Sequence, residues 1–236
     1  MAQIPTEEVF TGLGDLKIFF RSWRPEAPRG VVAICHGVNS HSGQYLWVAD
    51  QLAASGFAVY ALDLRGRGRS EGERFHVAHI SEYVDDLTRL IDLAKSREPG
   101  APVYLLGHSA GGVVSCCYAL DRQDQLAGLI CESFAFQVPA PDVALAVIKG
   151  VSHLAPHAPV LRLHNEDFSR DPQVVRSMNE DPLIAGEVQP SITVAALVRD
   201  FDVDYRPGLV DDEAALAAAL ADADRWIVRN RTQVRG

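Results

Sequence analysis

Residues 103–112 read VYLLGHSAGG. An apolar run ends here in Gly-x-Ser-x-Gly, and a second apolar run with helical character follows at residues 113–120. This order predicts a strand, a sharp turn at Ser109 and a helix, with the glycines allowing neighbouring backbone to come close. Such a turn lifts the serine hydroxyl above the sheet and directs the N–H of Ala110 to where an oxyanion forms. The motif also occurs by chance in tight turns, and the flanking strand and helix favour a catalytic serine.

Length, composition and charge limit the classes of protein to which the chain can belong. The chain has 236 residues, 47% hydrophobic and 22% charged, which suits one sizeable core with a small inserted lobe. A net charge of −9 argues against nucleic acid as a partner, because phosphate binding relies on clustered basic side chains. The sequence has no signal-peptide pattern and no apolar run near the ~20 residues that cross a bilayer. We therefore expect a cytoplasmic protein without a transmembrane segment.

The four cysteines lie in apolar strand or helix patterns and are expected to be reduced core residues: Cys35, Cys116, Cys117 and Cys131. A redox pair of Cys116 with Cys117 is a less favoured alternative. Their spacing matches no zinc site, and we expect neither a metal nor a cofactor.

Strand and helix patterns alternate over the first 131 residues. Two antiparallel strands are predicted at 8–14 and 16–23, buried strands at 30–35, 57–61, 103–106 and 126–131, and helices at 45–55 and 80–94. This alternation predicts an α/β fold with an open, mostly parallel sheet flanked by helices. Ligands of such sheets bind beyond the carboxyl ends of the strands, where the loop of His36, Gly37 and Val38 meets Ser109.

Three arginines follow the second buried strand, in the stretch DLRGRGRS at residues 63–70. They can bind phosphate or brace a turn. We favour a turn braced by Asp63 and Arg65, because no lysine-bearing phosphate loop accompanies them.

The strand pattern stops after Ser133, and from Pro139 to Val198 only helical patterns follow. We expect a helical cap at residues 137–198, inserted into a discontinuous core at 1–136 and 199–236. The apolar helix at 142–151 either packs on the core or lines a pocket for an acyl chain, and both interpretations stay open.

These motifs together resemble the monoacylglycerol lipase-like α/β-hydrolases of the serine aminopeptidase and lysophospholipase type. The resemblance covers residues 10–199. It implies the α/β-hydrolase fold, Ser109 as nucleophile and the N–H groups of Val38 and Ala110 as oxyanion hole. The sequence departs from the family at one position of these motifs, where Arg67 replaces the usual histidine. The matching motifs are His36-Gly37, Tyr45, Asp63-x-Arg65-Gly66-x-Gly68-x-Ser70-x-Gly72 and Gly107-x-Ser109-x-Gly111-Gly112.

The acid and the histidine of the triad follow the nucleophile in this fold. Here the last histidine is His164, and no apolar strand after the cap ends in Gly-x-x-Asp. Residues 213–230 nevertheless resemble the family's last helix, with an apolar face of Leu216, Leu220, Ala223 and Ile227. The simplest interpretation is that the core lacks a late strand-helix portion, with at most a vestige of the last strand at 201–205.

A serine hydroxyl is a poor nucleophile without an oriented base. His36 is expected to brace its loop, and His108 to point away from Ser109. Glu132 is the best-placed spare carboxylate. The remaining histidines of the cap are expected at its surface or in its packing: His153, His157 and His164.

The resemblance thus implies a serine esterase of lipid metabolism that cleaves monoacylglycerol or similar small acyl esters. The missing acid and histidine keep open an impaired relative that binds acyl ligands, or a structural, dimerising module. Haloperoxidase or lyase chemistry on the same fold also stays open. We further expect transient contact of the cap with a lipid interface, and a homodimer through an uncovered sheet edge beside residues 126–131.

Overall fold

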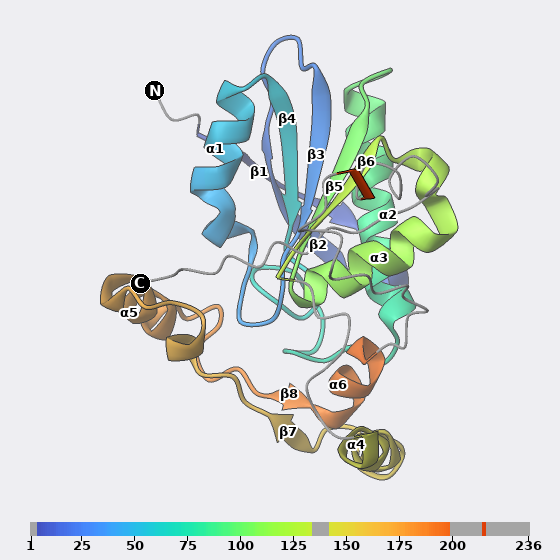
Figure 1. Cartoon of the computed structure of the whole chain (residues 1–236), viewed down its shortest axis with the longest axis vertical. Helices are drawn as coiled ribbons and strands as arrows, with labels where there is room; N and C mark the ends of the chain where they lie inside the picture. Colours follow the sequence, from blue (N-terminus) through green and yellow to red (C-terminus); the bar gives the residue numbers. More distant parts are fainter. Residues whose placement is uncertain (1–3, 134–141, 199–213, 216–236) are drawn as a thin grey trace.

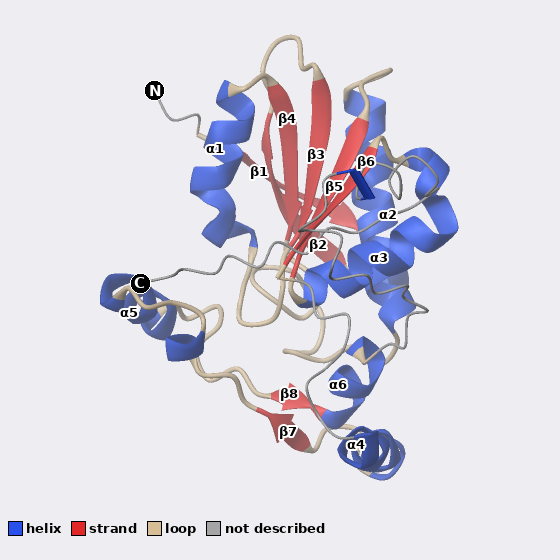
Figure 2. Ribbon diagram, viewed as in Figure 1, coloured by secondary structure: helices blue, strands red, loops and turns tan. Residues whose placement is uncertain are grey.

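The computed structural model describes residues 4–133, 142–198 and 214–215, and places a six-stranded sheet between layers of helices (Figures 1 and 2). The elements of the core are β1 (Thr6–Thr11), η1 (Leu13–Asp15), β2 (Lys17–Trp23), β3 (Gly30–Cys35), η2 (Ser42–Tyr45), α1 (Leu46–Ala54), β4 (Phe57–Leu62), α2 (Ile80–Arg97), β5 (Val103–His108), α3 (Ala110–Arg122), η3 (Gln123–Gln125) and β6 (Gly128–Glu132).

The sheet has the order β1-β2-β4-β3-β5-β6. The pairs from β4 to β6 are parallel, while β1 and β2 are antiparallel to their neighbours, which confirms the expected mostly parallel sheet. Since β3, β4 and β5 are parallel neighbours, the loops that follow them leave the sheet at the same edge. His36, Asp63 and Ser109 begin these loops and come together there.

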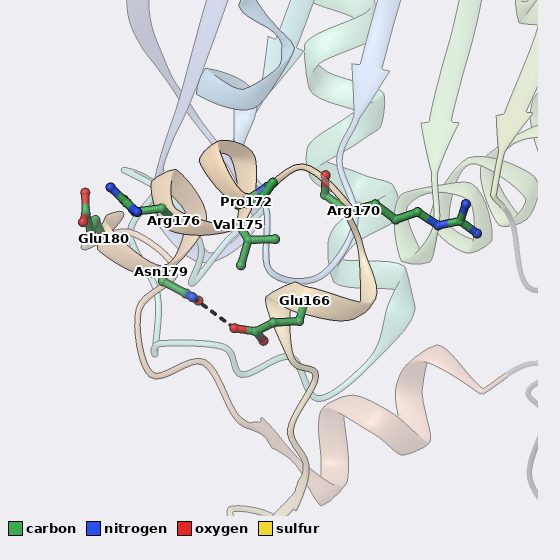
Figure 3. A pocket seen from close by; sticks show the side chains of 8 residues that line it. Glu166, Arg170, Pro172, Val175, Arg176, Asn179 and Glu180 are labelled. Carbon is green, nitrogen blue, oxygen red and sulfur yellow. Dashed lines mark hydrogen bonds between the residues drawn. The ribbon is translucent and has the colours of Figure 1, made fainter.

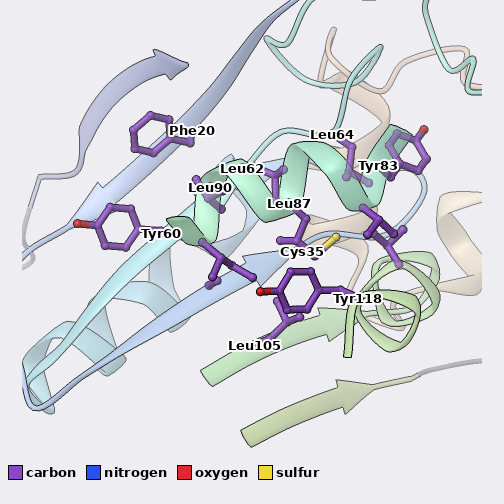
Figure 4. Packing of buried hydrophobic residues seen from close by; sticks show 14 of the residues in the cluster. Phe20, Cys35, Tyr60, Leu62, Leu64, Tyr83, Leu87, Leu90, Leu105 and Tyr118 are labelled. Carbon is purple, nitrogen blue, oxygen red and sulfur yellow. The ribbon is translucent and has the colours of Figure 1, made fainter. Parts of the chain in front are cut away.

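The hydrophobic core lies on both faces of the sheet. All six residues of β3 are buried, and its side chains alternate between two clusters. Val31 and Ala33 face the layer of α2 and α3, whereas Val32 and Ile34 face α1. Figure 4 shows the larger cluster, in which α2 packs across the strands. This two-sided burial explains the continuous apolar run at residues 30–35.

The segment of residues 142–198 lies at the carboxyl end of the parallel strands (Figure 1). It contains α4 (Asp142–Leu154), β7 (Pro159–Leu161), η4 (Asn165–Asp167), α5 (Pro172–Glu180), β8 (Gln189–Pro190) and α6 (Ser191–Leu197). The name cap is used below for its described residues, 142–198. The predicted separate unit of residues 137–198 stays a prediction.

The cap also contains an antiparallel pair of strands that the sequence pattern does not reveal. Pro159 pairs with Pro190, and Leu161 with Gln189. Two and three residues are too few to show an alternating pattern, and proline argues against a strand in sequence-based prediction. The sequence pattern predicts only helices in the cap, and the strand pair β7–β8 shows that this prediction is wrong.

Some expectations fall on residues outside the described ranges. These are the start of the cap before residue 142, the strand vestige at 201–205 and nearly all of the helix at 213–230, of which only residues 214–215 are described, as helical. Within the described residues, no helix combines the length and apolar character needed to span a membrane.

Candidate active site

Ser109 stands alone between β5 and α3 with a strained backbone, at φ 53° and ψ −120°. A residue with a side chain adopts this region only when its surroundings enforce it, at a cost on the order of 1–3 kcal/mol. Its N–H donates to the carbonyl of Glu132 at 2.9 Å, and its own carbonyl accepts from the N–H of Gly112 at 2.9 Å. The predicted strand, turn and helix are therefore confirmed, and Ser109 is held from both sides.

The glycines of Gly-x-Ser-x-Gly are required by close backbone contacts. A Cβ at Gly107 would lie 2.5 Å from Ser115 Oγ and 2.7 Å from the Gly111 carbonyl oxygen. A Cβ at Gly111 would lie 2.1 Å from the carbonyl oxygen of Cys35, at the end of β3. The turn thus packs backbone to backbone against the neighbouring strand, which leaves no room for side chains at these two positions.

The loop after β3 approaches the same serine. A Cβ at Gly37 would lie 2.9 Å from the Cβ of Ser109, so only glycine allows this approach. His36 supports the loop from below: its Nδ1–H donates to the Gly37 carbonyl at 2.7 Å, and its Nε2 accepts from the N–H of Leu64 at 2.9 Å. Complete burial lowers the pKa of His36 to about 4, so the ring is neutral near pH 7. The expected bracing role of His36 is confirmed.

The two predicted oxyanion donors belong to the two segments that meet at Ser109, the loop after β3 and the start of α3. Val38 directly follows Gly37, and Ala110 is the first residue of α3. The N–H groups of the first helical turn have no acceptor within their own helix, which leaves that of Ala110 free of the α3 ladder. The oxyanion hole of Val38 and Ala110 stays a prediction.

Asp63 braces the turn after β4, as the sequence predicts. Its buried carboxylate accepts the N–H of Ser42 at 2.7 Å and that of Arg69 at 2.8 Å. Arg65 holds Asp86 of α2 with two bonds, of 2.7 and 2.8 Å. These contacts support the bracing interpretation of the arginine stretch over phosphate binding.

Arg67 connects the core to the cap. Its side chain is almost completely buried and donates to Tyr83 Oη at 3.2 Å, to Gln189 Oε1 at 2.6 Å and to the carboxylate of Glu187. Glu187 is itself buried, so the two charges compensate each other out of contact with water. This network explains why arginine fits where the family usually has histidine.

A second core–cap contact involves a residue that the motifs do not single out. His41 donates from Nε2 to Asp181 Oδ2 at 2.7 Å, and its Nδ1 accepts the N–H of Gly43 at 3.0 Å. The two side chains are 140 positions apart in the sequence, and no local pattern signals their pairing.

The residues considered as substitute bases, and His41 in addition to them, lie in different surroundings. Both ring nitrogens of His36 and of His41 are engaged, so neither ring has a nitrogen left for Ser109. His108 packs edge-on against the ring of Tyr45 at 6.4 Å between centroids, and burial lowers its pKa. The other four side chains considered are exposed: Glu132, His153, His157 and His164.

A pocket of about 470 Å³ lies within the cap, between η4 and α5 (Figure 3). Glu166 and Asn179 face each other across it, with Asn179 Nδ2 donating to Glu166 Oε1 at 3.2 Å. None of its lining residues belongs to the turn of Ser109 or to the loop of Gly37, so this pocket does not mark the ester site.

Solved structures show the fold class. A thermostable carboxyl esterase from Bacillus coagulans aligns over 97% of this chain and 89% of its own, with a TM-score of 0.73 at 18% identity. A monoacylglycerol lipase from Paleococcus ferrophilus aligns over 76% of this chain and 68% of its own, with a TM-score of 0.66 at 29% identity. The fold is that of the α/β-hydrolases.

Sequence comparison narrows the class to a family. The model of the family described as serine aminopeptidase, S33, matches residues 26–202. The monoacylglycerol lipase of Mycolicibacterium smegmatis is 37% identical over 231 residues, which cover 94% of this chain and 80% of that protein. The monoglyceride lipase of Rattus norvegicus is 32% identical over 171 residues, covering 71% of this chain and 56% of that one. The chain belongs to the serine aminopeptidase S33 family. This membership and the likeness to these lipases together indicate a carboxylic-ester hydrolase.

Proposed function

We propose that this chain hydrolyses small acyl esters, such as monoacylglycerols, with Ser109 as nucleophile. The observation that carries the proposal is the strained turn of Ser109, with the loop of Gly37 packed against its Cβ. Backbone strain of this kind is expected where a side chain has to be presented for chemistry. The relatives from Mycolicibacterium smegmatis and Rattus norvegicus, a monoacylglycerol lipase and a monoglyceride lipase, support the substrate class.

In this mechanism Ser109 Oγ attacks the ester carbonyl carbon while its proton passes to a base. The carbonyl oxygen becomes an oxyanion, which accepts hydrogen bonds from the N–H groups of Val38 and Ala110. The ester C–O bond then breaks, and the alcohol leaves with a proton. Water attacks the acyl-enzyme in the same way, which releases the carboxylic acid and restores Ser109.

The base in this mechanism is not assigned to a residue. His36 and His41 already use both ring nitrogens, and no histidine follows His164 in the sequence. Loss of triad members lowers kcat on the order of 10⁴–10⁶-fold. Substrate binding and an oxyanion hole alone still give a rate about 10³–10⁴-fold above that of the reaction in water. We therefore expect the ester substrate to acylate Ser109 of this 236-residue chain to a detectable extent. The chain should turn the ester over slowly.

The cap supplies an apolar surface for a lipid substrate. Val143, Val147 and Leu154 of α4 are exposed, at 71%, 58% and 90%. Their spacing of four and seven residues places all three on one side of the helix. We propose that this side of α4 contacts the lipid interface from which the ester is taken.

The test is the reaction of the purified chain with p-nitrophenyl butyrate, followed by p-nitrophenol release and by intact mass. We expect a burst approaching one equivalent, with one butyryl group on Ser109, and neither burst nor adduct in Ser109→Ala. Hydrolysis that continues unchanged in Ser109→Ala would contradict the proposal. Binding of fatty acid without any acyl adduct would instead favour the impaired relative that binds acyl ligands.

A further inference from the structure

Three potential metal ligands converge outside the proposed ester site. Glu73 and His76 belong to the loop between β4 and α2, and His157 belongs to the turn between α4 and β7. One ligand atom from each of the three lies within 4.8 Å of the others. The cluster therefore joins a core loop to the cap.

The three side chains lie close together. His157 Nδ1 lies 2.9 Å from Glu73 Oε1, and the rings of His76 and His157 are stacked at 5.0 Å between centroids and 17° between planes. Glu73 and His157 line a pocket of about 140 Å³ at the border of the cap. Two imidazoles and a carboxylate are the three protein ligands of many zinc sites that keep a water in the fourth position.

The backbone around His76 is held in place by the cap. Thr193 of α6 donates from its hydroxyl to the carbonyl of Phe75 at 3.1 Å, and the same oxygen accepts the N–H of Val77 at 2.9 Å. Both neighbours of His76 are therefore fixed by one buried threonine. On the core side, the N–H of Phe75 donates to the Gly66 carbonyl at 2.9 Å.

The turn that carries His157 is anchored to the same helix. Ser191 Oγ donates to the carbonyl of Ala155 at 2.7 Å, and the N–H of Ser191 donates to the carbonyl of Ala158 at 2.8 Å. Ile192 donates its N–H to Pro156 at 3.1 Å. Both histidines thus have backbones tied to the first residues of α6, so their spacing is set by the fold rather than by side-chain contact alone.

We propose that Glu73, His76 and His157 bind one divalent cation of the Zn²⁺ type, with water completing a tetrahedral site. Ligand atoms of such a site lie about 3.3 Å apart. Small rotations of the three side chains bring their ligand atoms, which now lie within 4.8 Å of one another, to this separation. Glu73 and His157 are 58% and 61% exposed as side chains, which gives a cation access. Arg74 lines the same pocket, but its guanidinium is bound to the carbonyls of Gly68 and Leu183.

The bound cation would fasten the cap to the core. It adds coordination bonds between the core loop and the turn of His157, next to the contacts through α6. The proposal involves neither Ser109 nor the oxyanion loop, so it stands or falls independently of the proposed ester hydrolysis.

The direct test is titration of the chelator-treated chain with Zn²⁺ by calorimetry, repeated with Co²⁺ in the visible spectrum. We expect one site per chain, with affinity lowered at least about tenfold in Glu73→Gln, His76→Ala and His157→Ala, because each loses one of three ligands. The matched control is His153→Ala, an exposed histidine of α4 outside the cluster, which should bind like the unaltered chain. Co²⁺ should give the intense bands of a four- or five-coordinate site only in chains that keep the cluster.

A second measurement separates metal binding from folding. At equal Zn²⁺ concentration, Zn²⁺ should raise the Tm of the unaltered chain and of His153→Ala by more than that of His157→Ala. Far-UV circular dichroism without metal should be the same for all chains, since His157 is exposed and its turn is held by Ser191. Equal Zn²⁺ affinity in the unaltered chain and in a His76→Ala, His157→Ala double variant would overturn the proposal, as would loss of binding in His153→Ala.

Discussion

The turn of Ser109 and the cap are held in place by different kinds of interaction. Around Ser109, backbone packs on backbone, and Gly37, Gly107 and Gly111 leave no room for a Cβ. The cap is attached partly through polar side chains, among them the buried pair of Arg67 with Glu187, beside apolar contacts of α6 with the core. Contacts of the first kind tolerate no added atom, whereas contacts of the second kind can be removed pair by pair. The two regions should therefore respond differently to substitution.

The largest effect is expected for Gly111→Ala. Its Cβ would lie 2.1 Å from the Cys35 carbonyl oxygen, and no rotamer change relieves a clash with a strand's backbone. We expect a loss on the order of 5 kcal/mol in the free energy of unfolding, measured with urea. Gly150→Ala in α4 is the matched control: nothing lies within 4 Å of the new Cβ, and it should stabilise the helix by about 0.5–1 kcal/mol. Equal effects of the two changes would contradict the comparison.

The next largest effect is expected for Arg67→Met. This change leaves the carboxylate of Glu187 buried without its partner and should cost about 3–5 kcal/mol in unfolding free energy. A double variant with Glu187→Leu removes both charges and should recover most of that loss. The measurement is urea unfolding of both single variants and the double variant. A double variant as unstable as the two single changes added together would show that the pair is not coupled.

His36 should make stability depend on pH. Its folded pKa of about 4 lies below the value of about 6.5 for an unfolded chain, so the unfolded state binds more protons between these values. The contribution of His36 to the free energy of unfolding is therefore complete above pH 6.5 and is lost as the pH falls to 4. It amounts to roughly 3 kcal/mol. His36→Asn should be less stable at pH 7 but lose less on acidification. Parallel stability curves for the two chains, from unfolding between pH 7 and pH 4, would contradict this account.

The smallest effect is expected at the start of α5. Asp171 is its N-cap, and its carboxylate accepts the N–H of Gln173 at 2.8 Å. Asp171→Ala should cost about 1 kcal/mol, because one orphan N–H of the first turn loses its acceptor. Hydrogen exchange should show this loss in α5 alone and leave the protection of β5 unchanged. A similar rise in exchange in β5 would mean that cap and core unfold as one unit.

The same contrast explains what the sequence could predict. The sheet, the helices α2 and α3 and the turn of Ser109 follow from local patterns: apolar runs, helical spacing and Gly-x-Ser-x-Gly. The contacts of the cap join residues more than 100 positions apart, as with Arg67 and Glu187. Such pairs leave no periodic signal, because each member is a single polar residue in a loop. For the same reason the sequence predicted no metal site, although Glu73 and His76 meet His157 in space.

The central claim is that the strained turn presents Ser109 as the nucleophile, and covalent labelling tests it most directly. The purified chain is treated with a fluorophosphonate probe, and the adduct is located by mass spectrometry of its peptides. Ser133→Ala, which removes an exposed serine just after β6, serves as the control. We predict one adduct per chain on Ser109, retained in Ser133→Ala and abolished in Ser109→Ala. Labelling that persists undiminished in Ser109→Ala would contradict the account.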